Sequence, residues 1–388
     1  GRYRFDHQVM PPVSIVIAPV YPNTPVGLLS MTVHSILART PDTLLAEIVI
    51  VLERTTNLPV PEASDSTEGF AGEVNQLEKL TDKVRVLRCS GSSCGWQSRV
   101  ASRMRGFKEA TKGEVVIFMD PYLEVLSSTW MEHLVTPLVE NPRTITVPVL
   151  HHMDMAQRNY NPSDNSASYF VNVNANLDME YVSQSFDGKN TPSTWKPHDT
   201  PFMESWIFAV DRHEFTNLKD MDGGLYDTKA DSIGLSLKYQ MCHGRIVMVP
   251  CSRVGRVRSL ASDHQWIDPD VPTEIAKELD VQELDSRRTF NGQPVKDELT
   301  TLAVRNFLRT AAVWMTQSER DQVYAKMFGT APGDFPLGWK YYKLDWEDDD
   351  MDFNREELAQ EQQRCHDFSW FDKHILMTYL GQHHPWFT

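Results

Sequence analysis

Two carboxylate side chains stand directly after short apolar runs in the first third of the chain. Glu53 follows the run IVIVL, and Asp120 follows the run VVIFM. An acid at the end of a buried strand is placed at a candidate ligand site. Its carboxylate oxygens are of the kind that bind hard divalent cations. Further along, Asp231 and Arg256 add a third acid and a cation.

The apolar runs that precede these acids predict a parallel sheet, because they are short, β-branched and continuously apolar, as in strands buried on both faces. Segments 28–40 and 96–111 show apolar residues at helical spacing, and Gly113 follows the second as a helix stop. Ligands of such alternating sheets bind beyond the carboxyl ends of the strands, where Glu53 and Asp120 are expected. The predicted strands are residues 13–17, 48–52, 84–87 and 115–119.

Three later segments resemble one family of enzymes. Residues 237–257, LKYQMCHGRIVMVPCSRVGRV, resemble the end of the catalytic domain of polypeptide N-acetylgalactosaminyltransferases, where a Cys-Gly-Gly turn leads to a strand ending Pro-Cys-Ser-Arg-Val-Gly-His. Residues 299–324 resemble the family's Arg-Asn-x-x-Arg-x-Ala-x-Val-Trp-Met helix, and 364–371 its Cys-x-x-Phe-x-Trp tail. The resemblance runs nearly end to end.

The resemblance implies an α/β fold of the GT-A type, a Rossmann-like mixed sheet flanked by helices. It implies a nucleotide-sugar-binding half at residues 1–150 and an acceptor-side half with C-terminal helices at residues 151–388, within one globular unit. After 146–150, the segment 168–182 is expected to be antiparallel. We expect a single catalytic-type domain without the lectin domain that many family members carry.

The metal site of the family looks degenerate in this chain. The family binds Mn²⁺ through an Asp-x-His motif and the final His of the closing motif, and the matching positions here are Asp120, Tyr122 and Arg256. A guanidinium has no lone pair to donate, and a neutral phenol binds hard cations poorly. We therefore expect no metal, and an ion pair between Asp120 and Arg256 in its place. The alternative is that each side chain is merely a solvated strand-end residue.

The sugar-binding positions also depart from the family pattern. The family's Met-Ala-Gly-Gly-Leu-Phe segment is replaced by Met203–Phe208, which puts the indole of Trp206 where a glycine lines the donor sugar. An indole would fill much of that pocket, unless it faces the core instead. The family's Trp-Gly-Gly-Glu-Asn loop, whose Glu lies beside the sugar, corresponds to residues 228–232, where Asp231 keeps only the acid.

The nucleotide positions are altered as well. The family's Val-Asp-Asp motif reads Val-Leu-Glu here, so Leu52 stands where an aspartate contacts the base, and Glu53 follows it. An ungapped match aligns Arg103 with a family arginine and places Ala101 where another approaches the diphosphate. The resemblance thus assigns Glu53, Arg103, Asp120, Tyr122 and Trp206 to nucleotide-sugar binding.

The chain has five cysteines, and their spacing matches no zinc template. The resemblance implies a disulfide between Cys242 and Cys365. Cys89 and Cys94 could close a short loop, and Cys251 is unpaired or needs a partner outside this sequence. Disulfides would place the protein in the secretory pathway, in the Golgi lumen or secreted; buried free thiols in a reducing compartment are the alternative.

The composition excludes some partners. The chain has 388 residues, 41% of them hydrophobic, and a formal net charge of −15, which argues against binding nucleic acid or anionic membranes. No apolar run approaches the roughly 20 residues that span a bilayer. The sequence begins with Gly1 rather than Met, which leaves room for an upstream signal or anchor.

Two functions remain in competition. The first is an impaired or inactive transferase domain, a pseudoenzyme that binds a protein or glycan partner. The second is a metal-independent retaining transfer from a UDP-sugar to Ser or Thr of a polypeptide, with Asp231 beside the sugar and Arg256 on the diphosphate as catalytic residues. A hydrolase has little support, because the sequence has no Gly-x-Ser-x-Gly motif.

Overall fold

We describe the protein from a computed structural model. The described residues are 10–22, 24–53, 68–88, 99–154, 159–160, 169–173, 179–223, 225, 228–258, 289–290, 293–294, 309–311, 313–328 and 364–384. Cys89 and Cys94 lie outside this part of the chain, as does most of the segment between β12 and α9.

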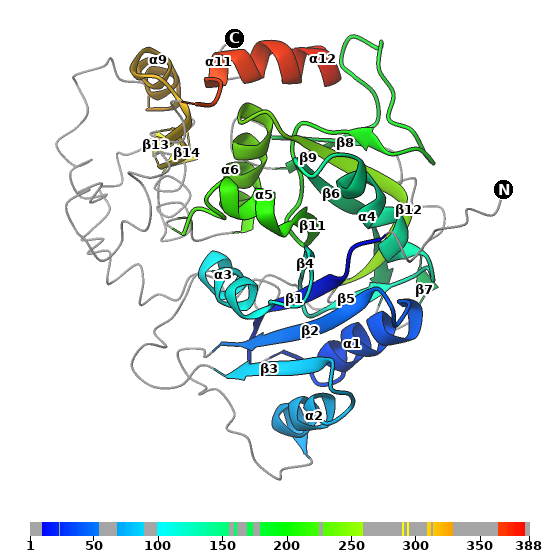
Figure 1. Cartoon of the computed structure of the whole chain (residues 1–388). Coiled ribbons are helices and arrows are strands. Elements are labelled where there is room, and N and C mark those ends of the chain that lie inside the picture. The colour runs from blue at the N-terminus through cyan, green and yellow to red at the C-terminus, as the bar shows by residue number, and fades with distance from the viewer. Residues whose placement is uncertain are drawn as a thin grey trace, which may run out of the picture.

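A twisted, mainly parallel sheet forms the centre of the molecule (Figure 1). Its strands follow the order β10, β12, β6, β11, β4, β1, β2, β3, with β5 added to β12 and β7 added to β6. The neighbours β1–β2, β1–β4, β2–β3 and β6–β12 are parallel, whereas β11 runs antiparallel to both β4 and β6. The strands are β1 (Val13–Val20), β2 (Leu45–Leu52), β3 (Val84–Arg88), β4 (Val115–Met119), β5 (Leu123–Val125), β6 (Thr144–Asp154), β7 (Asn159–Tyr160), β10 (His198–Asp199), β11 (Ile207–Asp211) and β12 (Arg245–Arg258).

The four predicted parallel strands are confirmed as β1, β2, β3 and β4, and the two predicted helices as α1 (Leu28–Arg39) and α3 (Arg99–Glu109). The antiparallel expectation for 168–182 is also confirmed, because β8 (Phe170–Val173) pairs with β9 (Met179–Val182) in a separate two-stranded sheet. The division at residue 150 stays a prediction.

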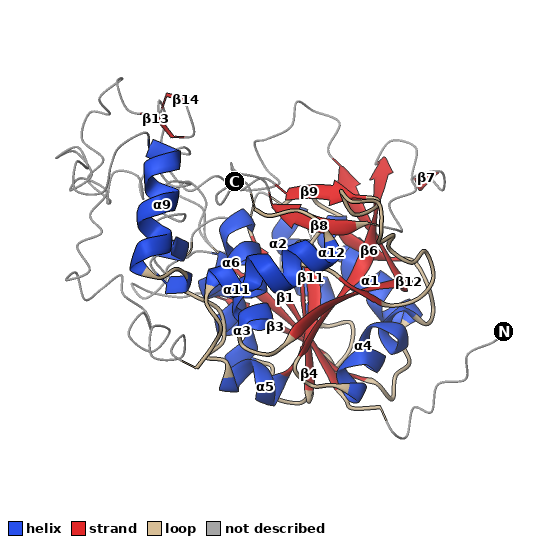
Figure 2. Cartoon of the chain, turned by 90° about the horizontal axis from the view of Figure 1, so that it is seen from above, coloured by secondary structure: helices blue, strands red, loops and turns tan. Residues whose placement is uncertain are grey.

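Side chains alternate between two cores, one on each face of the sheet. Along β1, Val16 and Ala18 face one core, whereas Ile15 and Ile17 face the other. The first core is covered by α3, α5 (Arg212–Asn217) and α6 (Thr228–Met241), and the second by α1, α2 (Gly69–Glu78) and α4 (Trp130–Glu140). Figure 2 shows α3 and α5 on one side of the strands and α1 and α4 on the other. Both faces of the strands are therefore buried, as their continuous apolar sequence predicts.

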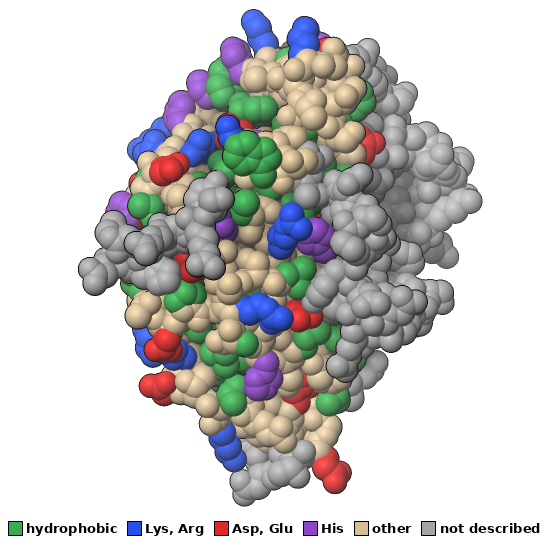
Figure 3. Space-filling view, turned by 90° about the vertical axis from the view of Figure 1, so that its right-hand side faces the viewer, with side chains coloured by type: hydrophobic (Ala, Val, Ile, Leu, Met, Phe, Trp, Pro, Cys, Tyr) green, Lys and Arg blue, Asp and Glu red, His purple; other side chains and the backbone are tan. Residues whose placement is uncertain are grey.

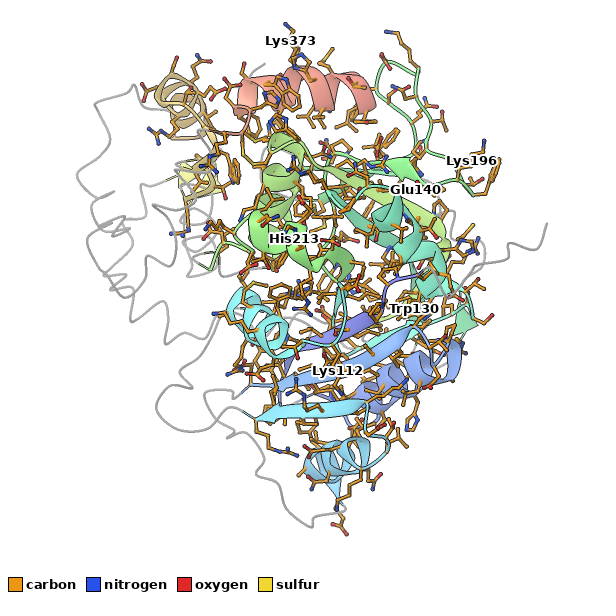
Figure 4. The ribbon with its side chains drawn as sticks, viewed as in Figure 1. Lys112, Trp130, Glu140, Lys196, His213 and Lys373 are labelled. Carbon is orange, nitrogen blue, oxygen red and sulfur yellow. A yellow bond between two sulfur atoms is a disulfide. The ribbon has the colours of Figure 1, made fainter. Side chains whose placement is uncertain are left out.

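The C-terminal elements extend the first core. Helix α11 (Phe368–Phe371), the π-helix η3 (Asp372–Leu376) and α12 (Met377–Tyr379) lie beyond α6, and Figure 4 shows Lys373 of this group pointing away from the body of the protein.

The predicted disulfide between Cys242 and Cys365 is confirmed, with the two Cα atoms 4.4 Å apart. It ties the end of α6 to these elements. Cys251 is a free cysteine that donates to the Trp195 carbonyl. The remaining described elements are β13 (Thr289–Phe290), β14 (Gln293–Pro294) and α9 (Gln317–Phe328).

Two surface properties bear on possible partners. On the face seen in Figure 3, basic, acidic and hydrophobic side chains are interspersed. None of the helices in the described ranges has the length and apolar character needed to cross a membrane.

Candidate functional site

The site is built around Asp120, which follows β4 at the carboxyl edge of the parallel strands and is 2% exposed. Its Oδ1 atom lies 3.0 Å from Nη2 of Arg99 and 2.9 Å from Nη2 of Arg103. Its Oδ2 atom accepts a hydrogen bond of 2.8 Å from the Tyr122 hydroxyl. Both oxygens of this carboxylate are therefore engaged by side chains of the protein.

The two arginines come from the buried face of α3. Arg99 and Arg103 are one helical turn apart, so both point to the same side of the helix. Helix α3 can approach the sheet closely because it carries Gly106, where a Cβ atom would collide with the side chains of Val16 and Val51. This close approach brings the guanidinium groups over the ends of the strands.

A second carboxylate, Asp231 in the first turn of α6, closes the network from the opposite side. Its Oδ2 atom is 3.5 Å from Nε of Arg99 and 3.5 Å from Nη1 of Arg103. Its Oδ1 atom accepts hydrogen bonds from the hydroxyls of Ser205, at 2.6 Å, and Ser232, at 3.3 Å. Two arginines and two aspartates thus form one buried network.

The Arg103 guanidinium keeps its charge despite its burial. Burial, followed by repulsion from Arg99, lowers the pKa of Arg103 to about 10, so this fully buried guanidinium stays protonated at neutral pH. Burial and the neighbouring Asp120 carboxylate raise the pKa of Tyr122 well above 10, so its phenol stays neutral and donates. The Ser205 carbonyl accepts further hydrogen bonds from both arginines, at 2.9 and 2.6 Å.

The expected ion pair between Asp120 and Arg256 is wrong. Asp120 pairs with Arg99 and Arg103, because α3 places their guanidinium groups directly at the end of β4. The guanidinium of Arg256, on β12, instead lies 3.6 Å from the centre of the Trp206 ring. Arg256 forms no ion pair with any carboxylate of the described residues.

Trp206 lies between the network and the surface. Its ring is half-buried against the second core, with Arg99 at 5.0 Å and Tyr122 in an edge contact at 6.2 Å. Its Nε1 atom donates to Glu204 at 3.3 Å, and Tyr181 donates its hydroxyl to the same carboxylate. The indole therefore contacts the second core and also lies beside the network. That it fills the pocket for a donor sugar stays a prediction.

Glu53 occupies the neighbouring position at the end of β2. It is 2% exposed and accepts hydrogen bonds from Ser102 and Arg105 of the same helix α3. Burial raises its pKa above 4.5, and the contacts with Arg105 and Ser102 offset this only in part. One helix therefore supplies cations to the acids at the ends of both strands.

Comparison with known proteins defines the family. The sequence pattern of glycosyl transferase family 2 matches residues 16–212, which is half of the chain. The chain belongs to this family. Its motifs and fold are those of a domain like the catalytic domain of polypeptide N-acetylgalactosaminyltransferases, so the predicted resemblance and GT-A fold are confirmed.

The relatives differ in what their names say about activity. Polypeptide N-acetylgalactosaminyltransferase 8 of Drosophila melanogaster is 26% identical over 330 residues, which are 84% of this chain and 47% of that protein. Polypeptide N-acetylgalactosaminyltransferase 11 of Xenopus tropicalis is 30% identical over 64% of this chain and 38% of its own length. The inactive polypeptide N-acetylgalactosaminyltransferase-like protein 5 of Macaca fascicularis is 28% identical over 64% of this chain and 52% of its own. The chain thus spans about half or less of these proteins.

A comparison with solved structures agrees with this assignment of the fold. A solved structure of GalNAc-T7 with UDP, GalNAc and Mn²⁺ superimposes with a TM-score of 0.65, at 21% identity, over 96% of this chain and 58% of that one. At this identity the match shows the fold alone.

At the three positions that the resemblance aligns with the family's Mn²⁺ ligands, the side chains are already engaged within the protein. Both Asp120 oxygens already accept hydrogen bonds, Tyr122 offers a donating phenol, and Arg256 offers a cation. In the part of the chain that the structure describes, no three His, Cys, Asp or Glu side chains converge as a metal site would require.

Sequence reasoning missed three members of the network: Arg99, Ser205 and Ser232. Arg99 could have been found from its four-residue spacing to Arg103 on a helix whose apolar face is buried, because two arginines on that face need anionic partners. Ser205 and Ser232 carry no comparable signal, since their roles depend on how β11 and α6 meet.

Proposed function

We propose that this domain keeps the fold of a polypeptide N-acetylgalactosaminyltransferase but does not transfer sugar, and that it acts by binding a protein or glycan partner. The observation that carries the proposal is the closed network of Asp120, Arg99, Arg103 and Asp231. A carboxylate that is already paired with two guanidinium groups is a poor ligand for a cation, because the cation would have to displace both.

The position of Asp231 supports the same proposal. The resemblance puts an acid beside the donor sugar at this point, yet here both carboxylate oxygens face arginines and serines of the protein itself. Reaching a sugar would require breaking contacts that hold two buried guanidinium groups in place.

A location in the secretory pathway, either the Golgi lumen or outside the cell, is part of the proposal. It is supported by the disulfide between Cys242 and Cys365, since disulfides persist mainly in oxidising compartments.

The second candidate, metal-independent transfer from a UDP-sugar to a polypeptide, rests on a different observation. Arg256 is a cation without a carboxylate partner in the described structure, and cationic side chains can stabilise a departing diphosphate. Under this alternative, Arg256 would contact the diphosphate and Asp231 would lie near the sugar.

Titration calorimetry of the chain with UDP and with UDP-N-acetylgalactosamine, in Mn²⁺ and in EDTA, separates the two candidates. The pseudoenzyme predicts no binding heat in either condition. Binding that survives EDTA, is lost in Arg256→Ala and is kept in Arg245→Ala would establish the metal-free transferase instead. Arg245 is the matched control because it begins the same strand β12, and its side chain is 38% exposed.

A further inference from the structure

The Arg256 side chain is a cation that the described structure leaves without an anion. Its guanidinium lies over the Trp206 ring, and its Nε atom is buried without a hydrogen-bond partner. Contact with an aromatic face offsets only part of the hydration that a cation loses on burial. Arg99 and Arg103, which are more deeply buried, each face two carboxylates.

The nearby acids are not free to serve Arg256. Asp120 and Asp231 are held by the other two arginines, and Glu204 accepts from the Tyr181 hydroxyl and from the Trp206 indole. Arg256 is only partly buried, so an anion can reach it from solvent. The geometry therefore leaves one guanidinium available to an external ligand.

We propose that Arg256, Trp206, Tyr181 and Glu204 form a binding site for a sugar residue that carries a single carboxylate. This inference rests on the proposed function and specifies its partner as an acidic glycan. The planar guanidinium would bind the carboxylate through two parallel hydrogen bonds. The Oε2 atom of Glu204, which accepts from neither Tyr181 nor Trp206, would accept hydrogen bonds from sugar hydroxyls. The ring of Tyr181, which is 52% exposed, would pack on the apolar face of the sugar.

The local charges favour a monoanion over a phosphate or diphosphate. Arg99 and Arg103 are paired with Asp120 and Asp231, which leaves Arg256 as the one guanidinium of the three without an ion pair among the described residues. A diphosphate would bring at least two negative charges to a site that offers one unpaired positive charge. One carboxylate matches the one guanidinium that lacks an ionic partner.

The test measures the affinity of the purified chain for N-acetylneuraminic acid, glucuronic acid and N-acetylgalactosamine by ligand-observed NMR. We expect the two acidic sugars to bind and the neutral sugar to bind at least tenfold more weakly, because hydrogen bonds to a charged group are the strong ones. Arg256→Gln should weaken the acidic sugars on the order of tenfold, and Arg245→Gln should leave their affinity unchanged. Arg256→Lys, which keeps the charge but not the two-pronged donor geometry, should give an intermediate loss.

Three results would overturn the inference: no preference for acidic sugars, equal losses in Arg256→Gln and Arg245→Gln, or binding of N-acetylglutamate in preference to the acidic sugars, which would point to an acidic peptide. Thermal melts of each variant show whether it is folded. UDP-N-acetylgalactosamine is titrated in the same samples. Transfer or nucleotide binding would refute the proposed function, whereas failure of the acidic sugars alone would refute only this inference.

Discussion

Three arginines meet at the carboxyl edge of the sheet, but they stand in two different environments. Arg99 and Arg103 are almost fully buried, and each faces Asp120 and Asp231 within 3.5 Å. Arg256 is only partly buried and contacts an indole rather than a carboxylate. The first pair stabilises the interior of the protein, whereas the third side chain can still accept a partner from outside.

The difference follows from where the side chains originate. Helix α3 is drawn onto β1 and β2 at Gly106, so arginines one and two turns earlier enter the interior, where only paired charges are tolerated. Arg256 belongs to β12, whose neighbours β5 and β6 place it beside Leu123 and His152 in register, farther from the acids of the network.

The largest effect is expected from Asp120→Asn, which keeps the shape of the side chain and removes its charge. Two buried guanidinium groups would then share Asp231 alone, so the free energy of unfolding should fall by about 3 to 5 kcal/mol. Chemical denaturation would measure this change. Added Mn²⁺ should not stabilise the wild-type protein.

The matched control is Asp42→Asn, because Asp42 also pairs with a cation, Lys83 at 2.6 Å, but its side chain is 92% exposed. This substitution should cost about 1 kcal/mol or less. Equal losses of unfolding free energy in Asp120→Asn and Asp42→Asn would mean that the buried network stabilises the protein no more than an exposed ion pair does.

A smaller effect is expected from Trp206→Leu. Arg256 would lose the aromatic face on which it rests, while the half-buried position keeps an apolar side chain, so we expect a loss of about 1 to 2 kcal/mol in the free energy of unfolding. Trp195→Leu is the control: Lys196 lies 4.6 Å from this ring, but Trp195 is 57% exposed and the loss should be about 0.5 kcal/mol. A loss at Trp206 no larger than at Trp195 would argue against a desolvated contact with Arg256.

The sheet and its flanking helices could be predicted because their signals are local. The runs at 48–52 and 115–119 are apolar at every position, and this pattern is typical of a parallel strand buried on both faces. The positions of Glu53 and Asp120 then follow from topology, because they come directly after β2 and β4, the two strands that flank β1.

The pairing within the site could not be predicted with the same success. Arg99, Arg103 and Arg256 all lie near Asp120 in the fold. The sequence does not say which of their guanidinium groups the packing of α3 and β12 brings to about 3 Å from the Asp120 carboxylate. The two substitutions at Tyr122 and Arg256 suggested a direct replacement of the metal by an ion pair. Two cations of helix α3, Arg99 and Arg103, pair with Asp120 instead, and Arg103 lies 17 residues before it in the sequence.

The smallest effect concerns Glu53, the acid at the end of β2, and its pH dependence sharpens the contrast with Asp120 and Asp231. Burial raises the pKa of Glu53 above 4.5, so the folded protein holds a proton there more strongly than the unfolded chain does. Stability should therefore fall as the pH rises from the unfolded pKa through the raised folded pKa.

Glu53→Gln cannot titrate at this position, so its stability relative to wild type should rise over that pH window, as measured by denaturation between about pH 4 and pH 7. Arg105→Gln removes the cation that lowers the pKa of Glu53, so its own stability should fall more steeply with pH than that of wild type. A flat difference between wild type and Glu53→Gln would show instead that Arg105 and Ser102 fully compensate the burial of this carboxylate.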